Sequence, residues 1–284
     1  MAHRTEFKRM VLGLPLSVTD YEMVGVTAKL AELLRLTLVA MYVEDHRLID
    51  IASLPCVREL RALGGGWQPI EVGQLTTELE HAAITAHRLF SDIARNCNVE
   101  TSFRIERGSA ADVISSLATA EDIVVIIEPK HPVERVTQQF TRLIDAAFQA
   151  SAAVMIIPCR VARLGGPIVA VAANPDDPSI GTAMGIAAAA HEKLIVVSSS
   201  EQIGSSASLE TLAESAGVRV QFVRSKKGPL QATALADNLQ QLNERLIVIS
   251  RGTLADAEAT TLASLRSTPV VIVEPDSPAS INTR

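Results

Sequence analysis

Short runs of apolar residues alternate along the chain with longer stretches in which apolar residues recur every three or four positions. Short apolar runs are typical of strands buried on both faces of a parallel sheet, and the longer period is typical of helices that cover such a sheet. In the first part of the chain the runs predict five strands, at about residues 9–15, 37–43, 99–106, 122–127 and 153–157. The stretches between them predict helices at about residues 20–35, 74–96, 110–119 and 134–150.

The same order of runs and stretches occurs a second time. Five further apolar runs lie at about residues 167–173, 193–198, 218–223, 245–249 and 269–273. A repeat of this length indicates a duplicated domain and not a solenoid of short units. We therefore predict two α/β domains, residues 1–160 and 161–284, each with a five-stranded parallel sheet covered by helices on both faces.

The fifth strand of each predicted sheet, residues 154–157 and 270–273, would form an apolar edge. Such an edge invites pairing with another strand. We predict that the two edges face each other within the chain and form an internal pseudo-dimer. A further homodimer of whole chains is left open.

Composition and charge argue against several classes of protein. Hydrophobic residues make up 48% of the chain and aromatic residues only 3%, so the cores are expected to consist of Val, Ile, Leu and Ala. No apolar stretch approaches the roughly 20 residues of a membrane helix, and we expect no membrane span and a cytoplasmic location. The net charge of −6 is spread over both halves, without the basic face typical of nucleic-acid binding. The three cysteines form no Cys-x-x-Cys pair and the serines no Gly-x-Ser-x-Gly motif, so we expect neither a metal site nor a catalytic residue.

The order of the apolar runs, the segment Pro269-Val-Val-Ile-Val273 and the duplication together resemble a tandem universal stress protein over nearly the whole chain. The resemblance implies an adenine nucleotide alpha hydrolase-like (Rossmann-like) fold and a role in the stress response. In the nucleotide-binding branch of that family, an Asp at the end of strand one contacts adenine and ribose. A Gly-x-x-Gly-x9-Gly-[Ser/Thr] motif follows strand four, and its glycines let backbone N–H groups approach the phosphates.

The strand-one Asp of the family is missing from both halves. Its position holds Pro15 in the first half and Ala172 in the second. Asp176 and Asp177 follow a few residues later, where we favour a turn and a helix cap over a ribose contact.

The glycine motif is also degraded. In the first half its three glycine positions hold Ile127, Lys130 and Phe140, and Thr141 alone matches the terminal hydroxyl position. The second half keeps one glycine, in the segment Ser250-Arg-Gly-Thr253. A side chain at a glycine position keeps the backbone away from a phosphate, so a cofactor is not expected.

These departures predict a non-catalytic regulatory binding protein of the stress response whose ATP-binding motif has been lost. Two alternatives stay open: a protein that binds ATP or AMP through a non-standard loop at residues 250–253, and a small-molecule sensor with a cleft between the halves. The ligand would be a small molecule or an unknown protein partner. The candidate ligand-binding residues follow strands one and four: Pro15, Ser17, Glu128, Lys130, Thr141, Asn174, Ser250, Arg251, Gly252 and Thr253.

The first half carries an insertion at residues 44–73, after its second strand. Segments 48–54 and 57–63 are amphipathic, and the only tryptophan, Trp67, follows a run of three glycines. As a lid, the insertion would fold over a disused pocket near Pro15, Leu16 and Glu128. The side chains that such a lid would bury are Leu54, Val57, Leu60 and Trp67. The alternative is an amphipathic element that binds a partner or lies next to a membrane.

Overall fold

The computed structural model describes residues 7–14, 21–44, 46–61, 65–135, 137–151, 153–198, 203, 207–224 and 231–274. Strands and helices alternate as predicted. The first half contains β1 (Arg9–Leu14), α1 (Tyr21–Leu34), β2 (Thr37–Glu44), α2 (His46–Ala52), β3 (Arg58–Arg61), β4 (Gly65–Pro69), α3 (Val72–Arg95), β5 (Thr101–Arg107), α4 (Ala110–Leu117), β6 (Asp122–Ile127), α5 (Pro132–Arg135), α6 (Gln138–Ala150) and β7 (Ala153–Ile157). The second half contains β8 (Ile168–Val171), α7 (Pro178–Ala190), β9 (Leu194–Ser198), α8 (Ala207–Ala216), β10 (Val220–Arg224), α9 (Ala232–Asn238), β11 (Leu246–Ser250), α10 (Asp256–Arg266) and β12 (Val270–Val273).

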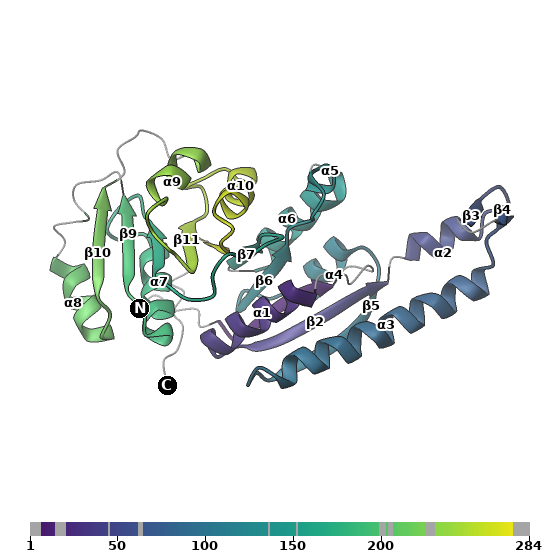
Figure 1. Ribbon diagram of the computed structural model, residues 1–284, viewed down its shortest axis with the longest axis horizontal. Coiled ribbons are helices and arrows are strands. Elements are labelled where there is room, and N and C mark those ends of the chain that lie inside the picture. Colours follow the sequence, from purple (N-terminus) through teal and green to yellow (C-terminus); the bar gives the residue numbers. More distant parts are fainter. Residues whose placement is uncertain are drawn as a thin grey trace.

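Ten of these strands form one continuous sheet, in the order β10-β9-β8-β11-β12-β7-β6-β1-β2-β5 (Figure 1). Within each half all neighbouring strands are parallel, and the strand orders of the two halves match. The fifth strands β7 and β12 pair antiparallel, with Val154 opposite Ile272 and Ile156 opposite Val270. This pairing confirms the predicted internal pseudo-dimer. The domain boundary at residues 160/161 stays a prediction.

Helices cover both faces of the sheet. One face packs against α1, α3, α7 and α8, and the other packs against α4, α6, α9 and α10. Both layers continue across the junction of the halves, where α1 packs on α7. The cores consist mainly of Val, Ile, Leu and Ala, as the composition predicted. None of the helices in the described part of the chain is long and apolar enough to cross a membrane.

The segment that joins the halves depends on one glycine. Gly166 has φ +121°, and a Cβ at this position would lie 2.1 Å from the carbonyl oxygen of Asn243. Its backbone N–H donates to Glu192 Oε1 at 3.2 Å. Only glycine fits this close approach of two backbones, which fixes the start of the second half against the loop before β11.

The insertion projects away from the sheet. Helix α3 has 24 residues, roughly 36 Å, and its buried residues all lie from Ala83 onward. The helix α2 packs on α3, and the hairpin of β3 and β4 lies at the free end of α3, away from the sheet (Figure 1). We call α2, the hairpin and the first turns of α3, residues 46–82, the arm.

The arm corrects the predicted lid. Leu54, Leu60 and Trp67 are 49%, 62% and 65% exposed, and Val57 is only half-buried. The burial predicted for these side chains is therefore wrong. The physical reason is the length of α3, which extends beyond the sheet and carries the insertion outward. Pro15 and Leu16, against which the lid was expected to pack, lie outside the described residues.

Candidate functional site

Ligands of doubly wound α/β sheets bind beyond the carboxyl ends of the strands, where the strand order reverses. In this sheet those places are the ends of β1 and β6 in the first half and of β8 and β11 in the second. Two of the predicted ligand residues of the first half, Pro15 and Ser17, lie outside the described residues. The remaining candidates can be placed.

A buried carboxylate occupies the reversal point of the second half. Asp177 caps α7, and its Oδ1 accepts hydrogen bonds from the Ser179 N–H at 3.0 Å and from the Ser250 hydroxyl at 2.5 Å. The Ser179 Oγ lies 2.7 Å from the same oxygen. Asp177 Oδ2 accepts from the Ala173 N–H at 2.9 Å. The structure thus confirms the helix-cap interpretation of Asp177 and joins the end of β8 to the end of β11 through it.

The other candidates of the second half lie in turns around this network. The exposed Asn174 accepts from the Asp176 N–H at 3.0 Å through its Oδ1. After β11, the Thr253 N–H donates to the Ser250 carbonyl at 3.0 Å, and Gly252 has φ +84°. Residues 250–253 therefore form a tight turn in which the retained glycine serves the backbone conformation.

Arg251 reaches from this turn into the first half. Its Nη1 lies 2.6 Å from Glu274 Oε1, at the end of β12. The guanidinium lies over the ring of Phe148, a residue of α6, with Cζ 4.6 Å from the ring centroid. A cation stacked on an aromatic face and paired with a carboxylate is held in place from two sides.

Glu128 reaches from the first half into the second. It is 1% exposed, and its Oε1 accepts from Arg135 Nη1 at 2.9 Å and from the hydroxyl of Ser264 in α10. Arg135 also donates to the Pro129 carbonyl at 3.1 Å. Among the described residues, the second oxygen, Oε2, has no hydrogen-bond partner.

Glu128 and Arg251 occupy equivalent places in the two halves. Each is the first residue after strand four, and each backbone N–H donates at 2.8 Å to the last residue of strand five, Ile157 or Val273. Each side chain contacts the helix before strand five of the other half. The positions that follow strand four are thus used in both halves for contacts between the halves.

In the first half, the remaining positions that correspond to the family's glycine motif have other roles. Lys130 and Thr141 have exposed side chains, and Thr141 donates to the Thr137 carbonyl at 3.3 Å. Thr137 caps α6 by accepting from the Phe140 N–H at 3.3 Å. The Phe140 side chain is buried in the core. The sequence placed a large side chain at this glycine position, and the structure uses it for packing.

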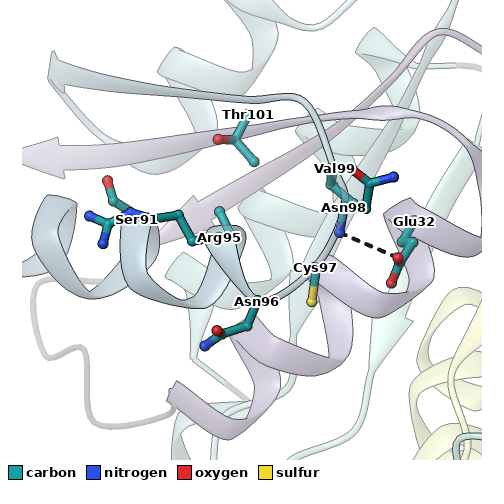
Figure 2. Close-up of a pocket in the computed structure, with 9 residues that line it drawn as sticks. Glu32, Ser91, Arg95, Asn96, Cys97, Asn98, Val99 and Thr101 are labelled. Carbon is teal, nitrogen blue, oxygen red and sulfur yellow. Dashed lines mark hydrogen bonds between the residues drawn. The ribbon is translucent and has the colours of Figure 1, made fainter.

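A cavity of about 550 Å³ lies at the opposite, amino end of β5 (Figure 2). It is lined by residues where α1 and α3 end, among them Glu32, Arg95, Asn96 and Cys97. The Asn98 N–H donates to Glu32 Oε1 at 3.3 Å across its rim. Burial raises the pKa of the Cys97 thiol, and the nearby Glu32 carboxylate raises it further, which makes this thiol a poor nucleophile. The sequence analysis did not predict this cavity.

Among the described residues, no cluster of three or more His, Cys, Asp or Glu side chains could hold a metal ion.

No family model matches the chain, and no curated protein matches it. Among solved structures, a universal stress protein from Archaeoglobus fulgidus DSM 4304 superposes with a TM-score of 0.60 at 12% identity. The match covers 93% of this chain and 96% of that chain, so it extends over both halves. At this identity the likeness shows the fold alone. The chain has an α/β, Rossmann-like fold similar to that of a universal stress protein.

Proposed function

We propose that this chain is a non-catalytic regulatory binding protein of the stress response, in which the positions after strand four join the two halves and do not bind ATP. One observation carries the proposal. Glu128 and Arg251, the equivalent residues after strand four, both contact the opposite half. A residue engaged in such a contact is not available to a phosphate group.

The charges at the carboxyl ends of the strands support the same conclusion. Glu128 and Asp177 place a buried carboxylate near the reversal point of each half. Arg251 is already paired with Glu274. A triphosphate bound there would meet buried negative charges at short range, and a buried anion without free donors or cations costs several kcal/mol.

Titration calorimetry with Mg-ATP tests the proposal directly. We expect no heat of binding at about 1 mM ligand, a concentration that would detect even weak sites. AMP is titrated in parallel because it lacks the outer phosphates. Protein isolated from its native host should retain no nucleotide in mass spectrometry.

A micromolar dissociation constant for ATP or AMP would overturn the proposal in favour of the nucleotide-binding alternative. The Gly252→Val variant would then show whether the turn at residues 250–253 is the site, because a side chain there blocks close approach of a phosphate.

Two further expectations remain predictions. A small-molecule sensor would need a cleft between the halves, and the cavity described above lies within the first half. The other expectation is a cytoplasmic location. Neither bears on the contacts that Glu128 and Arg251 make.

A further inference from the structure

We propose that β5 is a homodimerisation edge that pairs antiparallel with β5 of a second copy of the chain, with Ile105 at the two-fold axis. The strands β5 and β10 are the outermost strands of the ten-stranded sheet. An outermost strand has one row of backbone N–H and C=O groups that its own sheet does not use, and a second copy can pair with that row. The chain already contains one junction of this kind, because the edges β7 and β12 pair antiparallel between the halves.

The free row of β5 can be assigned residue by residue. The Glu100 carbonyl accepts from the Leu38 N–H at 2.9 Å, and the Gly108 N–H donates to the Glu44 carbonyl at 3.0 Å. Along a parallel ladder every second residue bonds to the same neighbour, so the even-numbered residues of β5 bond to β2. The odd-numbered residues direct their N–H and C=O groups away from β2: Thr101, Phe103, Ile105 and Arg107.

This row restricts the registers that a second copy can adopt. In an antiparallel pair, the residues that exchange two hydrogen bonds lie directly opposite each other. An odd-numbered residue must therefore lie opposite an odd-numbered residue of the second copy. This condition is met when the two-fold axis passes through a residue of β5 and not between two residues.

The charges of β5 select one of these registers. Only three positions of the axis keep at least five of the seven residues of the strand paired: Phe103, Arg104 and Ile105. An axis at Arg104 places two arginines opposite each other, and an axis at Phe103 places Glu106 opposite Glu100 of the second copy. With the axis at Ile105, Arg104 lies opposite Glu106 of the second copy, and the pair occurs twice. Opposite charges at directly opposed positions stabilise a strand pair, and like charges destabilise it.

Arg104 and Glu106 are available for this pairing. In the described part of the chain, neither side chain takes part in a hydrogen bond or an ion pair. Arg104 is exposed and Glu106 is half-buried. Charged side chains protect an edge strand when they repel a second strand. Here a basic and an acidic residue on either side of Ile105 make the strand complementary to itself under two-fold rotation.

The other face of β5 adds an apolar contact. Ile105 is 52% exposed, and in this register it lies opposite Ile105 of the second copy. His87 of α3 packs on Phe103, with 4.7 Å between the ring centroids. Ile84 lies one turn before His87 and is 56% exposed. Both exposed isoleucines therefore lie beyond this contact, toward the carboxyl end of β5, where a paired strand would cover Ile105.

The opposite edge of the sheet lacks this property. The strand β10 has five residues, and Arg224 is its only charged residue. No register can therefore place opposite charges of two β10 strands against each other. A contact between β5 of one copy and β10 of another would not close and would produce a filament.

A charge exchange in the full chain tests the register. Sedimentation analysis should show a concentration-dependent dimer of the native chain. Arg104→Glu alone and Glu106→Arg alone should each raise the dissociation constant at least tenfold, because like charges then lie opposite each other twice. The double variant Arg104→Glu/Glu106→Arg should dimerise again, and so should a mixture of the two single variants. The control is Arg219→Glu, which changes an exposed arginine next to β10 and should leave the dimer unchanged.

Cysteine cross-linking tests the position of the axis. Residues that exchange hydrogen bonds in an antiparallel pair have Cα atoms about 5.5 Å apart, which is within the range of a disulfide. Ile105→Cys in a Cys56→Ser/Cys159→Ser background should therefore give a covalent dimer with oxidised glutathione, and the retained Cys97 is buried. Arg107→Cys in the same background should not, because an axis at Ile105 separates the two copies of residue 107 by more than about 12 Å.

Three results would overturn the proposal. One is a native chain that stays monomeric at about 100 µM, well above the concentrations at which specific dimers form. Another is a dimer that Arg104→Glu leaves intact, or one that the double variant and the mixture fail to restore. The third is a covalent dimer through Arg107→Cys without one through Ile105→Cys, which would place the axis elsewhere. None of these results depends on whether the protein binds ATP.

Discussion

The two halves of the sheet differ most at their carboxyl ends. In the second half the chain passes from β9, which ends at Ser198, to α8, which begins at Ala207, and the nearby reversal point is closed by Asp177 and its hydrogen bonds. In the first half the equivalent connection, from Glu44 to Val72, leaves the sheet as the arm. Both halves bury a carboxylate at this end, Glu128 or Asp177, but among the described residues only the first half also carries an exposed apolar cluster there.

The difference shows how two halves with the same strand order can differ at one end without a change in their sheets. A buried carboxylate is stable only when its oxygens accept hydrogen bonds, and Asp177 meets this condition with four donors. An exposed apolar cluster is tolerated when another surface covers it. In the second half, Asp177 and its hydrogen-bond donors therefore hold the strand ends together, and we call them the lock. The first half instead has the features of an interaction surface.

The largest effect is expected where the lock is removed. Asp177→Ala would leave the N–H groups of Ala173 and Ser179 and the hydroxyl of Ser250 without their acceptor, and it would remove the cap of α7. We expect a loss of about 3–4 kcal/mol in the free energy of unfolding, measured by urea denaturation. The control is Asp176→Ala, an exposed neighbour that should change stability by less than about 0.5 kcal/mol. Equal effects of the two variants would contradict the lock.

The next effect concerns the contacts between the halves. Arg135→Met would leave the buried Glu128 with Ser264 as its remaining partner, and we expect a loss of about 2–3 kcal/mol. Arg251→Met removes the equivalent cation of the second half, but its partner Glu274 is half-exposed, so we expect a loss below about 1 kcal/mol. Urea denaturation of both variants measures the difference. A larger loss for Arg251→Met would show that the stacking on Phe148 dominates this junction.

The fold was predictable because its signals are local. Apolar runs such as residues 153–157 and 270–273 can be stable only when buried, and their edges had no other partner in the chain, which is why their pairing could be predicted. The cap at Asp177 was also predictable, because an Asp before Pro178 at the start of an apolar helical stretch is a local pattern.

The contacts of the site were not predictable in the same way. Ser264 lies 136 positions from Glu128, and Ser250 lies 73 positions from Asp177, so no local pattern connects them. The direction of the arm depends on how far α3 extends past the sheet. The sequence shows that segments 48–54 and 57–63 are amphipathic, but not whether their apolar sides face the sheet or solvent.

A smaller effect on stability is expected when the arm is shortened. Replacing residues 48–66 with a short Gly-Ser linker should lower the free energy of unfolding by less than about 1 kcal/mol, because most of the large apolar side chains removed are exposed. In the native chain, Trp67, the only tryptophan, should emit like indole in water and be quenched by iodide, because its side chain is exposed. A loss of several kcal/mol in the free energy of unfolding would contradict the exposed arm and favour the predicted lid.

The smallest expected effect is a difference in labelling rate between a thiol of the arm and a thiol outside it. The variants that test it leave the fold intact. Cys56 is exposed and Cys97 is buried, with a pKa raised by burial and by the neighbouring Glu32. In a Cys159→Ser background, the variant that retains only Cys56 should react with a disulfide reagent at least about 100-fold faster at neutral pH than the variant that retains only Cys97.

The raised pKa of Cys97 also sets the sign of a pH effect on stability. The unfolded chain ionises its thiol first, so the stability linked to Cys97 is complete below the ordinary thiol pKa and decreases as the pH rises through the raised value. Comparing the native chain with Cys97→Ser across this range isolates the contribution. Equal labelling rates for the two thiols would show that the contact between the ends of α1 and α3 opens freely.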